Sequence, residues 1–249
     1  MNSLDETVSL VSELGVKKVN KSLKAQIVLG FIAGAMISLG YMAYIKCVAT
    51  IDGGLGNVLG ASIFPIGLLV ILLAGGELIT GNMTVVATAY WNKKVTLSQL
   101  AKNWLVITLA NIAGALFVAL IVGTYLGTLS SYQDVINNLA QSKAHYDPLR
   151  TFVSGIICNW FVGLGVWLNI VMKDGAGKIM GIWFPVMVFV LLGFQHSVAN
   201  IFLMGISMSY GGITISQFLS NFVFSYLGNI VGGAVFVGLF YVMANSHKK

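Results

Sequence analysis

Long apolar segments alternate with short polar ones along almost the whole chain. An α-helix needs about 20 mostly apolar residues to cross the hydrocarbon core of a bilayer. The segments long enough to span a membrane are residues 25–48, 58–91, 103–127, 149–172, 178–208 and 215–243. The second and fifth of these are longer than a simple crossing requires. The pattern therefore predicts an all-α membrane protein with six transmembrane helices.

Glycine and polar residues interrupt the second and fifth apolar segments. The interruptions contain the sequences Gly75-Gly76-Glu77, Thr80-Gly81-Asn82 and Gly193-Phe194-Gln195-His196-Ser197. Non-helical backbone at membrane depth leaves N–H and C=O groups unpaired, at several kcal/mol each in lipid. Such backbone is tolerated only where protein or a water-lined cavity meets those groups. Broken second and fifth helices, and a pore between them, are therefore predicted.

The two halves of the chain resemble each other. Residues 108–114 match residues 226–232 at an offset of 118, and residues 31–34 echo residues 152–155 at an offset of 121. The offset of 118 also relates polar residues of the interruptions: Asn82 to Asn200 and Glu77 to Gln195. Three crossings per half give an inverted 3+3 repeat. Mirrored breaks in such a repeat indicate a substrate site, where half-helix N-termini offer positive dipole ends to anions.

Composition and charge agree with this assignment. Of all residues, 57% are hydrophobic and 9% are charged, against about 25% charged in soluble domains. Eleven of the 14 lysines and arginines lie in residues 17–24, 93–102, 173–178 and 248–249, which are alternate loops on one side. The net charge of +6 is therefore a topology signal rather than a sign of nucleic-acid binding. An excess of basic residues marks cytoplasmic loops, so a multi-pass protein of the cell membrane with both termini in the cytoplasm is predicted.

The chain divides into three parts. Residues 1–24 are polar, with apolar side chains at helical spacing: Leu4, Val8, Val11 and Leu14. This segment is either an amphipathic helix on the cytoplasmic membrane surface or a solvated leader. Residues 25–243 form one channel domain, and residues 244–249 are a cytoplasmic tail.

Two side chains in the breaks have chemistry that suits a pore. His196 is the only histidine inside a predicted span, and ionisable groups within a membrane indicate function by default. It either exchanges a proton with a weak acid near neutral pH or stays neutral and hydrogen-bonded within the bundle. Thr80 lies in the other break, where its hydroxyl either donates to an anion or caps the half-helix that follows.

Other polar residues near the breaks have more structural interpretations. Glu77 either accepts hydrogen bonds from the broken backbone, which is the favoured alternative, or carries a coupling proton. Asn82 and Asn200 are expected to hold broken-helix backbone in place. Lys143 and Arg150 either draw anions toward the mouth of the pore or are solvated loop charges.

Enzyme and metal chemistry find little support in the sequence. The sequence contains no H-E-x-x-H, G-x-S-x-G or C-x-x-C motif and no phosphate-binding glycine loop. Cys47 and Cys158 lie inside apolar segments and are expected to be small buried hydrophobic residues. One intramembrane histidine and two scattered cysteines do not make a metal site. We therefore expect neither an enzyme nor a bound cofactor.

Several motifs resemble the formate–nitrite transporter family. Residues 193–200 (GFQHSVAN) are similar to its fifth-span signature, and residues 77–82 (ELITGN) to its second-span loop. Residues 102–105, Asn111 and residues 158–160 also fit, and the resemblance extends from about residue 20 to residue 243. It implies an aquaporin-like fold and a homopentamer with one pore per protomer.

The resemblance also implies roles for residues along the pore. It places the pore histidine at His196, the pore threonine at Thr80, the vestibule lysine at Lys143 and a central pore-facing asparagine at Asn159. A cytoplasmic-side constriction maps to Phe64, Leu68 and Phe189, and an outer constriction to Leu78 and Ile79. Members of the family pass formate, nitrite, hydrosulfide or lactate.

Two departures from the family pattern leave the preferred anion open. Gln195 stands where the family often has glutamate, and Ile79 where formate channels often have phenylalanine. The expected function is a channel for small monovalent anions of weak acids (formate, nitrite or hydrosulfide), which pass after protonation at His196. The alternatives are a proton-coupled symporter of the same anions, an intramembrane enzyme or scaffold, and a neutral-solute channel, although the paired Asn-Pro-Ala boxes of aquaporins are absent.

Overall fold

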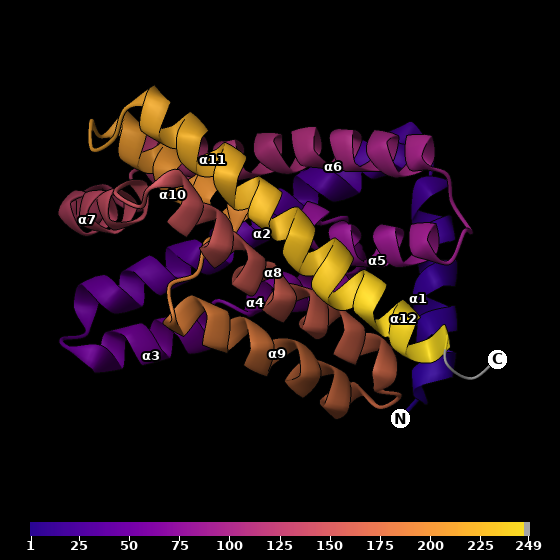
Figure 1. Ribbon diagram of the computed structural model, residues 1–249. Coiled ribbons are helices and arrows are strands. Elements are labelled where there is room, and N and C mark those ends of the chain that lie inside the picture. The colour runs from indigo at the N-terminus through magenta and orange to yellow at the C-terminus, as the bar shows by residue number, and fades with distance from the viewer. Residues whose placement is uncertain (247–249) are drawn as a thin grey trace.

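The computed structural model describes residues 1–246, and these residues form helices joined by short loops (Figure 1). The elements are α1 (Leu4–Val19), α2 (Leu23–Thr50), α3 (Gly54–Ile63), α4 (Ile66–Val70), η1 (Ile71–Gly75), α5 (Ile79–Trp91), α6 (Leu97–Phe117), η2 (Val118–Tyr125), η3 (Ser130–Tyr132), α7 (Gln133–Ala144), α8 (Pro148–Val171), α9 (Gly175–Leu191), α10 (Ser197–Ser209), α11 (Ile215–Ile230), η4 (Val231–Leu239) and α12 (Phe240–Ser246).

Five helical stretches are long and apolar enough to cross a membrane. They are Leu23–Thr50, Gly54–Gly75, Leu97–Tyr125, Pro148–Val171 and Ile215–Asn245. The apolar helices α9 and α10 are shorter, at 17 and 13 residues, and follow each other in the chain. Helix α5, also of 13 residues, follows the second stretch after a three-residue gap. The chain is thus a multi-pass membrane protein by the length and apolarity of its helices.

The bundle has two distinct ends (Figure 1). Helix α1, α12 and the links α5–α6 and α8–α9 lie at one end, and α7 and the link α2–α3 lie at the other. We call these the α1 end and the α7 end. Residues 247–249 of the predicted C-terminal tail lie outside the described residues.

Helix α1 packs on the bundle. Its buried Val8 and Val11 contact a cluster that includes Val85 of α5 and Trp167 of α8. The helix begins with a capping box, in which Ser3 and Glu6 bond each other's backbone N–H. The apolar spacing in residues 1–24 thus belongs to a helix whose apolar side faces α5 and α8.

Two helix pairs pack closely through glycine, α2 on α6 and α8 on α11. A Cβ on Gly34 of α2 would collide with the carbonyl oxygen of Asn111, and a Cβ on Gly228 of α11 with the carbonyl oxygen of Phe152. Close backbone approach at small residues is how helices associate in lipid, where hydrophobicity alone does not drive them together.

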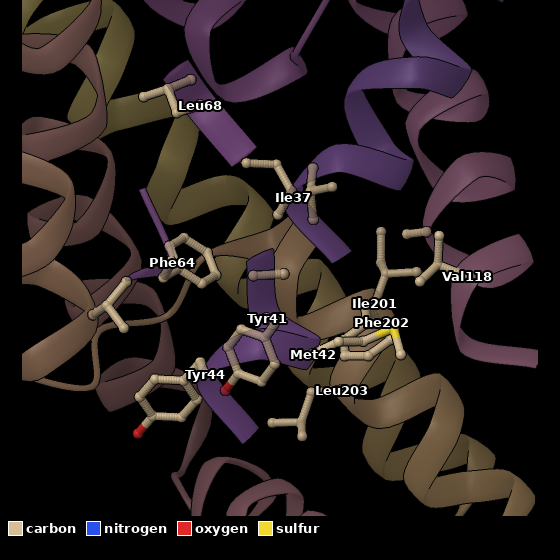
Figure 2. Close-up of a cluster of buried hydrophobic side chains, with 14 of the residues drawn as sticks. Ile37, Tyr41, Met42, Tyr44, Phe64, Leu68, Val118, Ile201, Phe202 and Leu203 are labelled. Carbon is tan, nitrogen blue, oxygen red and sulfur yellow. The ribbon is translucent and has the colours of Figure 1, made fainter. Parts of the chain in front are cut away.

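A large cluster of buried hydrophobic side chains lies inside the bundle, and Figure 2 shows part of it. The ring of Tyr41 meets those of Phe64 and Phe202 edge to face, at centroid distances of 5.7 and 5.9 Å. This cluster joins α2, the residues between α3 and α4, and α10. It therefore packs around the start of α10, which follows the non-helical residues between α9 and α10.

Candidate functional site

The two interruptions place Thr80 and His196 in contact. Helix η1 ends at Gly75 and α5 begins at Ile79, while α9 ends at Leu191 and α10 begins at Ser197. Thr80 Oγ1 lies 3.0 Å from His196 Nε2, and both side chains are buried. The structure therefore brings together the two residues that the sequence singled out, although they are 116 positions apart.

His196 is held as the N-cap of α10. Its Nδ1 accepts a hydrogen bond from the backbone N–H of Ala199 at 3.1 Å. A nitrogen that accepts cannot carry a proton, so the neutral ring has its proton on Nε2 and donates it to Thr80 Oγ1. A second proton could reach Nδ1 only if the bond to Ala199 opened. This geometry therefore holds His196 as a neutral hydrogen-bond donor.

Thr80 does not cap α5. The N-cap residue of this helix is Leu78, which makes no side-chain cap bond. The backbone N–H of Ile79 instead donates to Asn111 Oδ1 at 2.8 Å. Among the described residues, the hydroxyl of Thr80 bonds only His196. Since it accepts from Nε2–H, its own proton is available to a ligand.

A cavity of about 210 Å³ opens from His196 toward the α7 end. We call it the α7-side cavity. The ring of Phe189 stacks on His196 at 5.7 Å, and Phe64 meets Phe189 edge to face at 5.9 Å. Lys143 also lines this cavity. The α7-side cavity thus combines aromatic walls with one lysine and one histidine.

A second cavity, of about 260 Å³, lies toward the α1 end. We call it the α1-side cavity. It is lined by Lys17, Lys18 and Lys21, by Glu77, and by apolar side chains that include Leu68 and Leu78. Each cavity therefore combines basic side chains with an apolar wall, and the Thr80–His196 pair is buried where the two interruptions meet.

The apolar constriction residues are grouped differently from the expectation. The resemblance placed Phe64, Leu68 and Phe189 together, but Phe64 and Phe189 line the α7-side cavity while Leu68 lines the α1-side cavity. Leu78 lines the α1-side cavity with Leu68, and Ile79 lines neither. The reason is helix geometry: residues four positions apart are separated by about 6 Å along a helix axis. Phe64 and Leu68 therefore lie at different depths.

Asn159 supports the backbone near Thr80. Its Nδ2 donates to the carbonyl oxygens of Thr80 at 3.1 Å and Asn229 at 2.7 Å. The side chain is fully buried and lines neither cavity, unlike the pore-facing asparagine that the resemblance implies. Its Oδ1 has no hydrogen-bond partner among the described residues.

Glu77 binds side chains rather than the broken backbone. Its Oε2 accepts from Lys18 Nζ and Asn82 Nδ2, both at 2.8 Å, and its Oε1 lies 3.7 Å from Lys21 Nζ. The favoured expectation of backbone donors was therefore wrong, because α1 packs over the residues before α5 and brings Lys18 to the carboxylate of Glu77. The backbone of Glu77 is held instead by Asn111, whose Nδ2 donates to its carbonyl oxygen at 2.9 Å.

An equivalent network surrounds the second interruption. Gln195 Oε1 accepts from Asn200 Nδ2 at 2.6 Å and from Asn221 Nδ2 at 3.3 Å. Asn229 Oδ1 accepts from the backbone N–H of Ser197 at 2.9 Å, and its Nδ2 donates to the carbonyl oxygen of Gln195. The members correspond at the offset of 118: Glu77 to Gln195, Asn82 to Asn200, Asn103 to Asn221 and Asn111 to Asn229.

Lys143 bonds the backbone just before the second network. Its Nζ donates to the carbonyl oxygens of Gly193 and Phe194, each at 3.2 Å. Partial removal of this side chain from water lowers the pKa of Lys143 to about 8. Arg150 lies outside the α7-side cavity and stacks over the ring of Tyr146 at 5.2 Å. Of the two basic residues considered from sequence, only Lys143 lines the α7-side cavity.

Sequence reasoning missed Lys18, Asn103 and Asn221. The repeat carried the signal for the asparagines, since the offset of 118 relates them. Lys18 lies on the same buried side of α1 as Val8 and Val11. The signal in the sequence was this charge at a position where the helical spacing predicts a packed side chain. Within residues 1–246, no three His, Cys, Asp or Glu side chains come together as a metal site requires.

Comparisons with known proteins agree with this geometry. A sequence profile described as formate/nitrite transporter matches residues 5–243. The formate channel BtFdhC of Bacillus thuringiensis is 44% identical over 243 residues, which cover 95% of this chain and 93% of the relative. A solved structure described as an FNT family ion channel gives a TM-score of 0.89 at 26% identity, covering 96% of this chain and 98% of that one.

A second solved structure, a pentameric formate channel with formate bound, gives a TM-score of 0.79 at 25% identity over 90% of this chain and 98% of that one. The family profile thus extends over nearly the whole chain, a relative is 44% identical, and two channel structures share the fold. The chain belongs to the formate/nitrite transporter family.

Proposed function

We propose that this protein is a membrane channel for small monovalent anions of weak acids: formate, nitrite or hydrosulfide. The observation that carries the proposal is the buried Thr80–His196 pair, with a lysine-lined cavity toward each end of the bundle. The relative BtFdhC is named a formate channel, and a similar structure is a pentameric formate channel with formate bound. We extend both properties to this chain, as an anion pore in each subunit of a homopentamer.

Six crossings in an inverted 3+3 repeat account for the arrangement. Helices α3 to α5 make the second crossing, and α9 and α10 make the fifth, each interrupted at the midplane. The correspondence of the two asparagine networks at one offset supports this topology. We assign the α1 end to the cytoplasm, because nine of the 14 basic residues lie there within residues 1–246, in or next to α1 and the links α5–α6 and α8–α9.

The central barrier is the removal of water from the anion. Idealised transfer of a bare charge into an apolar medium costs up to tens of kcal/mol. The anion meets Phe64 and Phe189 on the α7 side and Leu68 and Leu78 on the α1 side. A neutral acid crosses such walls far more readily. We therefore propose that Lys143 gathers the anion and that it passes the centre as formic acid, nitrous acid or hydrogen sulfide.

His196 and Thr80 supply the proton in concert. The hydroxyl proton of Thr80 passes to the anion, and the Nε2 proton of His196 passes to Thr80 Oγ1. At the same time Nδ1 releases the N–H of Ala199 and takes a proton from a water in the α7-side cavity, and a proton from the solvent on that side neutralises the hydroxide that is left. The ring stays neutral throughout and changes only its tautomer. The bond between Nδ1 and Ala199 reforms when the ring resets, so the helix cap sets the resting state.

Flux into liposomes tests the proposal directly. Protein purified as a homopentamer, as judged by native mass spectrometry, is assayed with formate, nitrite, hydrosulfide and lactate at two pH values. We expect at least one of the first three to move faster than in protein-free vesicles, and faster at the lower pH. Flux of none of these anions, with glycerol or water transported instead, would identify a neutral-solute channel. Acceleration of the flux by anion on the opposite side would identify an alternating-access carrier, such as a symporter, instead of a channel.

A further inference from the structure

The two networks around the helix interruptions are alike in shape but differ in charge. At the α1 end the central side chain is the carboxylate of Glu77, and at the α7 end it is the neutral amide of Gln195. Both side chains are buried, and each accepts from the asparagine five positions later. The two networks therefore differ in the charge that each places beside its neighbouring lysine.

Glu77 neutralises the lysines at the α1 end. Lys18 Nζ lies 2.8 Å from its carboxylate and Lys21 Nζ lies 3.7 Å from it. The carboxylate is almost fully buried, so water screens this attraction poorly. Of the lysines that line the α1-side cavity, only the exposed Lys17 has no ion pair within residues 1–246.

Lys143 keeps its charge uncompensated at the α7 end. Its Nζ bonds two backbone carbonyl oxygens, which are dipoles and carry no net charge. Within residues 1–246, no carboxylate lies within ion-pair distance of Lys143. Lys143 lines the α7-side cavity, and its ammonium bonds the residues just before Gln195. An anion that enters from the α7 end would therefore meet this charge in the cavity that leads to His196.

We propose that Gln195 is a specificity-determining residue, which leaves Lys143 free to bind the permeating anion and so makes the α7-side cavity the high-affinity side of the pore. The proposal rests on the anion-channel function proposed above. A glutamate at position 195 would accept from Asn200 as Gln195 does. It would lose the bond that Gln195 Nε2 donates to the backbone carbonyl oxygen of Lys143 at 3.4 Å, and it would add a negative charge beside that lysine. Gln195 thereby sets the affinity of the α7 side without touching the anion itself.

The asymmetry has a defined kinetic form. A passive pore cannot change an equilibrium, so Vmax/KM must be equal for flux in the two directions. Tighter binding on the α7 side therefore appears as a lower KM and a proportionally lower Vmax from that side. A charge-based difference also weakens as salt shortens the Debye length, from about 30 Å at 0.01 M to about 3 Å at 1 M.

The test compares labelled formate uptake into right-side-out and everted membrane vesicles that contain the full-length protein. For the wild type we expect a KM roughly 10-fold lower from the α7 side at low salt, converging with the other side at high salt. Gln195→Glu should remove most of that difference by raising the KM on the α7 side. Gln195→Asn is the matched control, because it disturbs the same hydrogen bonds without adding charge, and it should preserve the asymmetry.

The outcomes separate this inference from the proposed function. If the wild type carries none of the tested anions, the channel function fails. If it carries formate but shows the same KM from both sides at low salt, only the role of Gln195 fails, and this result needs no variant to fold. Equal effects of Gln195→Glu and Gln195→Asn would also overturn it, because they would show a structural rather than an electrostatic role. Glu77→Gln gives a reciprocal check, since it should lower the KM from the α1 side.

Discussion

At the scale of single residues, hydrogen bonds decide what the ionisable groups of the pore can do. His196 accepts at Nδ1 and donates at Nε2, so its resting state is one neutral tautomer. Lys143 is held by two carbonyl oxygens and no carboxylate. The proposed proton exchange at His196 and the proposed attraction of the anion by Lys143 both depend on these bonds.

We predict that His196→Asn assembles but conducts poorly. Asparagine is among the best N-cap residues, so it should hold the N–H of Ala199 and preserve α10. It cannot relay a proton by changing tautomer as the imidazole does, so weak-acid flux should fall by roughly 100-fold, the scale of general acid–base catalysis. The remaining flux should lose much of its pH dependence in liposomes. An unchanged pH profile in a well-assembled variant would exclude the proton exchange and leave a pore selected by size and dipoles.

Anion binding should depend on the charge of Lys143. With a pKa of about 8, the ammonium is mostly protonated at pH 7 and mostly neutral at pH 9. The KM from the α7 side, measured at low ionic strength, should therefore rise across this range. Lys143→Arg is the matched control, because arginine stays charged, and its KM should rise less. Parallel curves for the two proteins would mean that the pH dependence comes from the substrate alone.

At the scale of elements, two helices outside the long apolar stretches contribute basic residues to the walls of the two cavities. Helix α1 brings Lys18 to the first interruption, and α7 ends next to the second one with Lys143. Helix α1 is fixed at several points, including the N–H of Asn2 on the carbonyl oxygen of Val171 at 2.8 Å and Ser12 Oγ, which accepts from Asn92 Nδ2 at 2.7 Å. The N-terminal helix is therefore part of the wall of the α1-side cavity.

Removing Lys18 should destabilise the protein. Lys18→Ala leaves the buried carboxylate of Glu77 without its closest cation, and breaking a buried pair in this way costs about 3–5 kcal/mol. Lys21, at 3.7 Å, should reduce the loss. We expect a lower Tm in mild detergent, and recovery on adding Glu77→Gln. The control is Lys17→Ala at an exposed neighbour, and a Tm equal to that control would show that the pair contributes little.

At the scale of the whole molecule, the two ends of the bundle differ in charge. Within residues 1–246, most of the basic residues lie at the α1 end, and only Lys46, Lys143 and Arg150 lie toward the α7 end. Such a bias orients a multi-pass protein during insertion. The same bias leaves few cations at the α7 end, so Lys143 is the one lysine that lines the α7-side cavity.

Both termini should therefore face the cytoplasm. Reporter fusions at the two termini, one type active only inside the cell and the other only outside, check this directly. We expect cytoplasmic signals from both ends. An external signal from either terminus would reverse the assignment of the α1 end, and with it the side on which Lys143 acts.

Much of the fold and half of the site were predictable from local pattern. The bilayer fixes the length of an apolar helix, so the five long apolar helical stretches could be located from hydropathy alone. Gly193 adopts a positive φ of 73°, at the start of the interruption that its sequence predicted. His196 and Thr80 were identified because polar residues inside apolar membrane segments are rare and are usually functional.

Only the tertiary structure decided which side chains meet. Hydrogen bonds require distances near 3 Å and a defined direction, and these depend on helix rotation and depth, which hydropathy does not encode. The sequence by itself therefore determined a multi-pass helical protein and named Thr80 and His196. Folding decided that these two meet, that α1 covers Glu77 with Lys18, and that Phe64 faces the opposite cavity from the nearby Leu68.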